Sequence, residues 1–170
     1  MANETVATPE STGKTADGAS PAVRPIVVGY DGSDLAKAAL RVAIDVASCG
    51  AYGRIAIVCG QDRPPGWFGY TYRGPVVGKD ELLDELETHI VSDLEEAADL
   101  VRQAGIDAVT MCTREHPVDT MLTVARDVGA AMIVVGAKGT SAIQEVVMGS
   151  TTMRLLHRAM IPVLVVPEAA

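Results

Sequence analysis

The sequence predicts a single α/β domain in which parallel strands alternate with helices, and three observations support this prediction. Five short apolar runs rich in β-branched residues alternate along the chain with four amphipathic segments. The runs are apolar almost throughout, which is typical of strands buried on both faces of a parallel sheet. The 170 residues are enough for one substantial core. We therefore expect a doubly wound, Rossmann-like domain with a five-stranded parallel sheet and helices on both faces.

The first elements follow a segment that lacks core-forming residues. Residues 1–24 are rich in Thr, Ser, Ala, Gly and Pro, so we expect a disordered tail there and one domain over 25–170. The expected elements of the first half are a strand over 25–30, a helix over 35–50 with Ser33 as its N-cap, and a strand over 54–60.

A long connection follows the second strand. Residues 61–78, "QDRPPGWFGYTYRGPVVG", contain four of the six aromatic residues of the chain and are interrupted by Pro and Gly. Loops of this length in compact domains are more often lids or binding segments than plain connections. Two interpretations stay open: a lid over a ligand, and a cover for the sheet edge or a partner.

The second half continues the alternation. Apolar residues at spacings of three and four predict a helix over 79–103 that Gly105 ends. The remaining expected elements are a strand over 107–113, a helix over 118–130, a strand over 131–136, a helix over 150–160 and a strand over 161–168.

Composition disfavours several classes of function. Lys and Arg number 14 against 22 Asp and Glu, and the formal charge of −8 would repel nucleic-acid phosphates. The three cysteines show no CxxC spacing, so we expect buried thiols rather than disulfides or a zinc site. The N-terminus lacks the apolar segment of a signal peptide, and no apolar run has the length of a membrane span. We therefore expect a cytoplasmic protein that binds neither nucleic acid nor membranes.

Two strand-to-helix junctions carry residues suited to ligand binding, because ligands of doubly wound sheets bind at such junctions. The first, Tyr30 to Ser33, follows the first strand. In the second, "VVGAKGTSAIQEVVMGSTT" (134–152), Gly136 and Gly139 can adopt positive φ and admit a ligand close to the main chain. Gly149 to Thr152 open the next helix with N–H donors and hydroxyls, which suit an anion. From spacing alone, a plain turn and a helix cap explain these residues equally well.

Other motifs for catalysis are absent from the sequence. There is no GxxxxGK[ST] P-loop and no GxSxG nucleophile elbow, and the three histidines form no metal-like cluster. We therefore predict no catalytic and no metal-ligating residues.

The glycine pattern resembles a family motif. Gly136-x2-Gly139-x9-Gly149-Ser150 matches the G-x2-G-x9-G-[ST] motif of the nucleotide-binding branch of the universal stress protein family. "IVVGYDGSDLAKAAL" resembles the opening strand, aspartate and first helix of that family, and "IPVLVVP" resembles its closing strand. The resemblance spans residues 25–167. It implies a universal stress protein domain with strand order 3-2-1-4-5 and with Asp31 and Gly136 on facing sides of one crevice.

The resemblance also implies ligand contacts. Asp31 would contact the adenosine, Gly29 and Tyr30 would line the pocket, and Gly60 would lie beside the adenine. The implied ribose and phosphate contacts are Val135, Gly136, Lys138 and Gly139, and the implied triphosphate contacts are Gly149, Ser150, Thr151 and Thr152. The family commonly has Arg or His at the position of Lys138, and Gly60 has no side chain to pack on a base.

These implications lead to the hypothesis of a stress-response regulatory protein that binds ATP together with Mg2+. Its conformation or assembly would depend on the ligand, and a protein partner of unknown identity would recognise the bound state. The alternatives are an enzyme that hydrolyses ATP slowly or transfers its phosphate, a cAMP-binding member of the family, and a partner protein with a vestigial site. The sequence shows no general base or arginine finger aimed at a γ-phosphate, so any turnover would be slow.

The final apolar run, "PVLVVP", predicts an exposed edge strand in a monomer. Pairing with a second copy across a two-fold axis would cover that edge, and such dimers are familiar in the resembled family. We therefore expect a homodimer through the C-terminal strand.

Overall fold

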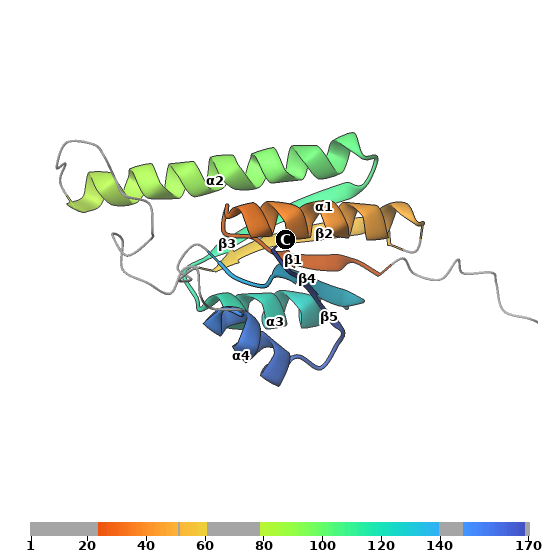
Figure 1. Ribbon diagram of the computed structural model, residues 1–170. Coiled ribbons are helices and arrows are strands. Elements are labelled where there is room, and N and C mark those ends of the chain that lie inside the picture. Colours follow the sequence, from red (N-terminus) through yellow and green to blue (C-terminus); the bar gives the residue numbers. More distant parts are fainter. Residues whose placement is uncertain (1–23, 51, 61–78, 140–147, 169–170) are drawn as a thin grey trace, which may run out of the picture.

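The chain forms three layers, with one parallel sheet between two pairs of helices (Figure 1). The computed structural model describes residues 24–50, 52–60, 79–139 and 148–168, and for residues 79–88 it describes the backbone alone. The elements in chain order are β1 (Ile26–Gly29), α1 (Asp34–Ser48), β2 (Arg54–Gly60), α2 (Lys79–Gln103), β3 (Asp107–Thr113), α3 (Pro117–Asp127), β4 (Met132–Gly136), α4 (Ser150–Arg158) and β5 (Val163–Val166).

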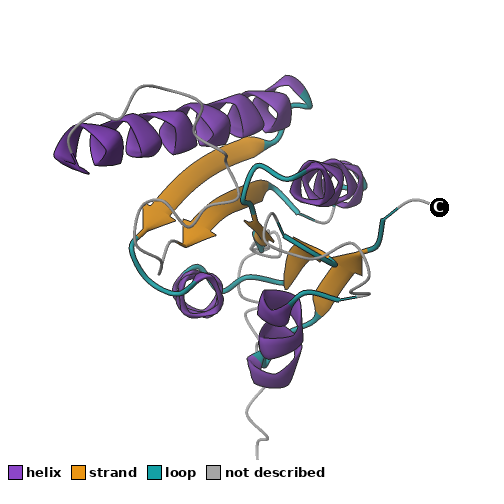
Figure 2. Cartoon of the chain, turned by 60° about the vertical axis from the view of Figure 1, so that its left-hand side comes forward, coloured by secondary structure: helices purple, strands orange, loops and turns teal. Residues whose placement is uncertain are grey.

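The strand order is β3-β2-β1-β4-β5, and every neighbouring pair is parallel. Helices α1 and α2 cover one face of the sheet, and α3 and α4 cover the other (Figure 2). The α/β class, the five-stranded parallel sheet and its 3-2-1-4-5 order are thereby confirmed.

The core lies on both faces of the sheet because its central strands are apolar at every position. Ile26, Val27 and Val28 of β1 have no exposed surface, and their side chains divide between the two apolar clusters that flank the sheet. Small residues let α1 approach the sheet closely, since Ala36, Ala39 and Ala43 are its buried positions beside Leu40 and Ala47. The close approach of α1 brings its first turn against the end of β4.

Most helix limits agree with the expected ones. Ser33 is the N-cap of α1, as predicted, and its Oγ accepts a hydrogen bond from Ala36 N at 3.1 Å. Helix α2 has the predicted bounds, and Gly105 beyond it has a φ of 77°. Helix α3 begins at Pro117 with His116 as its N-cap, one residue before the expected start.

Three expectations need comment. The tail expected over residues 1–24 lies outside the described residues except for Arg24, which donates hydrogen bonds to the carbonyls of Gly129 and Ala130 and so belongs to the folded domain. The expected loop over 61–78 lies entirely outside them. Buried thiols were expected, but Cys49 and Cys112 are exposed.

None of the described helices is long and apolar enough to cross a membrane.

Candidate functional site

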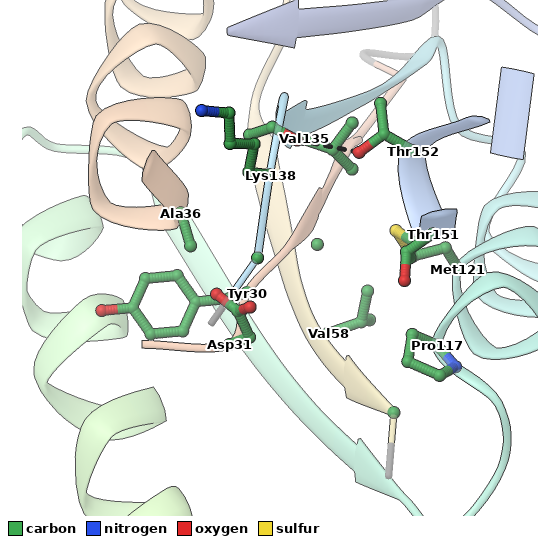
Figure 3. A pocket seen from close by; sticks show the side chains of 14 residues that line it. Tyr30, Asp31, Ala36, Val58, Pro117, Met121, Val135, Lys138, Thr151 and Thr152 are labelled. Atoms are coloured by element: carbon green, nitrogen blue, oxygen red, sulfur yellow. Dashed lines mark hydrogen bonds between the residues drawn. The ribbon is translucent and has the colours of Figure 1, made fainter. Parts of the chain in front are cut away.

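A pocket opens where β1, β2 and β4 end, between the junctions that follow β1 and β4 (Figure 3). β1 and β4 are neighbours, but the helices that follow them pack on opposite faces of the sheet. This is the point at which ligands bind in doubly wound sheets. With the space open to solvent included, the pocket has a volume of about 550 Å³. Its lining residues are Gly29, Tyr30, Asp31, Ala36, Val58, Gly60, Pro117, Met121, Val135, Gly136, Lys138, Gly139, Thr151 and Thr152.

The structure brings ten of the twelve predicted site residues to this one pocket. The other two, Gly149 and Ser150, are not among the lining residues; they directly precede Thr151 at the start of α4. The lining residues that sequence analysis missed are Ala36, Val58, Pro117 and Met121.

The missed residues are apolar, and three of them form one wall of the pocket. Val58, Pro117 and Met121 lie on one side, opposite Tyr30 and Asp31 (Figure 3). Pro117 and Met121 belong to the first turns of α3, which packs over β2 and β1. The strand order that the family resemblance implied would have indicated that α3 contributes to the pocket. In that order, the helix after β3 lies within reach of β1. An apolar wall of this kind suits the flat face of a base.

Asp31 is held at the other side of the pocket by the turn that starts α1. Its Oδ1 accepts a hydrogen bond from Ser33 N at 3.1 Å, and Gly32 between them has a φ of 77°. A Cβ atom added to Gly139 would lie 2.5 Å from Asp31 Oδ2. Glycine at position 139 thus lets the second junction lie against the carboxylate of the first, and a larger residue there would displace the Asp31 side chain.

Neither Gly136 nor Gly139 has positive φ, which corrects the explanation drawn from the sequence; Gly136 is required for close packing instead. Among the described residues, positive φ occurs at Gly32, Gly50, Gly105 and Gly129, not at Gly136 or Gly139.

At Gly136, close packing against α1 leaves no room for a side chain. A Cβ there would lie 2.9 Å from Leu35 Cβ and 3.0 Å from Leu35 C in the first turn of α1. At Gly60, a Cβ would lie 2.6 Å from Pro117 Cα at the start of α3. Both glycines therefore allow helices to reach the strand ends.

Helix α4 begins without a side-chain cap. Its N-cap is Gly149, which has φ −71° and ψ 157° and makes no side-chain cap hydrogen bond. Gly149 N itself donates to Ala137 O at 2.7 Å, which ties the start of α4 to the end of β4. The uncapped N–H groups and the positive end of the helix dipole are suited to an anion. Thr151 adds a hydroxyl at the same place, on the pocket wall.

Two predicted phosphate contacts have other partners in the structure. Thr152 is 4% exposed, and its hydroxyl donates to Gly136 O at 3.0 Å, which fastens α4 to β4. Lys138 Nζ lies 3.2 Å from Glu168 Oε2, and Figure 3 shows its ammonium directed away from Asp31. The main-chain N–H groups of α4, rather than these two side chains, are therefore the groups best placed for an anion.

Fold and pocket together define a doubly wound α/β protein with a pocket at its switch point. The model of the universal stress protein family matches residues 22–167. Since this match covers most of the chain, the chain belongs to the universal stress protein family.

Two of the similar solved structures are complexes of universal stress proteins with adenine nucleotides. The universal stress protein YxiE of Bacillus subtilis (strain 168) is 29% identical over 148 residues, which are 83% of this chain and 97% of the relative. A universal stress protein solved in complex with cAMP is 26% identical, with a TM-score of 0.59 over 86% of this chain and 98% of that chain. The universal stress protein from Archaeoglobus fulgidus in complex with dAMP is 26% identical, with a TM-score of 0.57 over 84% of this chain and 96% of that chain.

Proposed function

We propose that the protein binds an adenine nucleotide in this pocket, with ATP as the ligand, and regulates a stress response through the bound state. One observation carries the proposal: the uncapped start of α4 and the apolar wall formed by β2 and α3 meet in a single pocket. Such a site offers one surface for a base and another for phosphate. The cAMP and dAMP complexes of relatives support an adenine nucleotide as the class of ligand.

Each part of a nucleotide has a counterpart among the lining residues. Val58, Pro117 and Met121 would pack against the adenine, and the exposed carboxylate of Asp31 would accept hydrogen bonds from the adenosine moiety. The phosphates would then lie toward Thr151. The described residues contain no group of three or more His, Cys, Asp or Glu side chains that could hold a metal ion. Mg2+ would therefore bind mainly through the phosphates of the nucleotide itself.

Binding without rapid turnover fits the chemistry of the pocket. Asp31 is the one carboxylate among the described lining residues, and it lies across the pocket from Met121 and Thr151 (Figure 3). A general base must reach the attacking water, and this carboxylate lies on the adenosine side of the proposed ligand. Steady phosphate release that is lost together with nucleotide binding would favour the alternative of a slow ATPase or phosphotransfer enzyme.

Replacing Thr151 with Glu tests the site. The new carboxylate would compete for the first-turn N–H groups and repel phosphate, while a Glu in a first turn is compatible with the helix. We expect titration calorimetry to show binding of ATP, or of cAMP, to the wild type and a loss of affinity of about tenfold or more in Thr151→Glu.

Met153→Glu is the matched control. It makes the same charge change on the same helix, at an exposed residue that does not line the pocket. Equal affinities of Thr151→Glu and the wild type, or no binding of any adenine nucleotide to the wild type, would contradict the proposal.

We also propose a homodimer through β5. This strand lies at the edge of the sheet, Leu164 is 37% exposed, and Met160 before it is 95% exposed. An exposed apolar strand edge is a template for pairing with another chain. Leu164→Lys would place a charge in the paired surface, whereas Val165 packs against the core and is less suitable. We expect sedimentation velocity to show a wild-type dimer and a monomeric Leu164→Lys variant; a dimeric variant would refute pairing through β5.

A further inference from the structure

His116 connects the first turn of α3 with α4. Its Nδ1 accepts a hydrogen bond from Val118 N at 3.2 Å and so caps α3. Its other ring nitrogen, Nε2, lies 2.9 Å from Arg154 Nη1 on α4. Pro117, the residue after His116, lines the pocket, and so does Thr151, three residues before Arg154. Because residues three apart share a helix face, Arg154 lies one turn beyond Thr151, on the side of α4 that faces the start of α3.

The two contacts of His116 compete with each other. A neutral imidazole has one N–H group and one nitrogen that accepts. Val118 N and the Arg154 guanidinium are both donors, and they face the two ring nitrogens. Whichever nitrogen carries the proton, one of the two contacts places a donor against a donor. When the α3 cap is formed, the guanidinium is therefore held weakly, and an anionic acceptor nearby would be a better partner for it.

The helix that carries Arg154 is fixed by other contacts. One turn further along α4, Arg158 Nη1 lies 2.7 Å from Asp119 Oδ1 of α3. Leu155 has no exposed surface, and the buried hydroxyl of Thr152 holds the first turn to Gly136 O. Arg154 can thus exchange its partner by side-chain rotation while the backbone of α4 stays in place.

We propose that Arg154 binds the phosphates beyond the first and makes the site selective for nucleotides with a longer phosphate chain. This inference rests on the proposed function and specifies its ligand. The first phosphate would bind the main-chain N–H groups at the start of α4. Long side chains of a helix lean toward its N-terminus, which brings the guanidinium of Arg154 toward the outgoing phosphate chain. A guanidinium can bind two phosphate oxygens at once, whereas the phosphate of AMP or cAMP ends before it.

The test compares Arg154→Gln with Arg158→Gln. Both substitutions remove one positive charge from α4, one turn apart, but Arg158 faces Asp119 rather than His116. Titrations with ATP and AMP at one ionic strength and one Mg2+ concentration should show tighter binding of ATP to the wild type. We expect Arg154→Gln to weaken ATP binding about tenfold or more and AMP binding by less than about twofold. Arg158→Gln should leave the ratio of the two affinities unchanged.

The outcomes separate this inference from the proposed function. Equal losses for ATP and AMP in Arg154→Gln, or the same change of ratio in Arg158→Gln, would overturn the role of Arg154 and leave the nucleotide site intact. Binding of ATP to Arg154→Gln as tight as to the wild type would do the same. Absence of binding of either nucleotide to the wild type would overturn both proposals. Thermal unfolding of each variant shows whether an effect on binding reflects loss of folded protein.

Discussion

The two junctions that flank the pocket have the same topology and opposite chemistry. After β1, Asp31 accepts a hydrogen bond from Ser33 N, and Ser33 accepts one from Ala36 N, each at 3.1 Å. The first turn of α1 is therefore capped by its own sequence. After β4, helix α4 begins at Gly149 with no side-chain cap. The first turn of α1 is capped by side chains of its own junction, whereas the first turn of α4 begins at a glycine and has N–H donors of a kind that suits an anion.

Two glycines of the junction after β4, Gly136 and Gly149, differ in the space around them. Gly136 is required by packing, because Leu35 of α1 occupies the space of a side chain. Gly149 is in ordinary surroundings, where an added Cβ would have its nearest neighbour, Lys138 Cα, at 3.4 Å. The motif thus combines a glycine needed for the fold with a glycine that leaves a helix end uncapped.

The largest effect on stability should come from Gly136→Ala. Its Cβ would overlap the first turn of α1, and overpacking of this kind costs about 1–3 kcal/mol of the free energy of unfolding. Gly149→Ala, with room for its Cβ, is the control and should lower the free energy of unfolding by less, because it loses only the advantage of glycine over alanine at an N-cap. Urea unfolding measures both variants. If the two substitutions lowered stability equally, the distinction between the two glycines would be lost.

Smaller effects are expected from removing the cap of α1 and adding one to α4: the first should lower stability and the second nucleotide affinity. Ser33→Ala removes the cap of α1 and should lower the free energy of unfolding by about 1 kcal/mol while leaving nucleotide affinity in place. Gly149→Asp adds a cap to α4 and should change stability by only a few tenths of a kcal/mol, because glycine is a fair N-cap. The added carboxylate would occupy the donors that bind phosphate, so nucleotide affinity should fall. Unfolding curves and calorimetric titrations of both variants check this exchange, and unaltered affinity in Gly149→Asp would mean that the start of α4 does not bind the ligand.

The fold could be predicted from the sequence because its signals are local. The apolar strand runs and the helical spacing over 79–103 depend on residues close together in the chain, and the structure reproduces both. The N-cap at Ser33 is equally local. The strand order depended on the resemblance to a family, since nothing local specifies which strands become neighbours.

The site was predictable in position but not in the role of every residue. Lys138 and Glu168 are 30 residues apart, so their ion pair gives no local signal. Burial of the Thr152 hydroxyl depends on the end of β4, and the contribution of Met121 depends on the packing of α3 over β1. Spacing indicated which residues would lie together, whereas the atoms that each of them contacts are decided by tertiary packing.

The ion pair between Lys138 and Glu168 joins the pocket to the edge of the sheet. Glu168 follows β5 by two residues, and Ala137 N donates to Val166 O at 2.8 Å, so the pocket loop and the edge strand are directly linked. The Glu168 side chain is 69% exposed and that of Lys138 is 15% exposed, and an ion pair that is exposed at one end contributes on the order of 1 kcal/mol. A nucleotide that drew Lys138 away could therefore change dimer affinity through this link by a factor of about five. Linkage is reciprocal, so dimerisation could alter nucleotide affinity through the same pair by a similar factor.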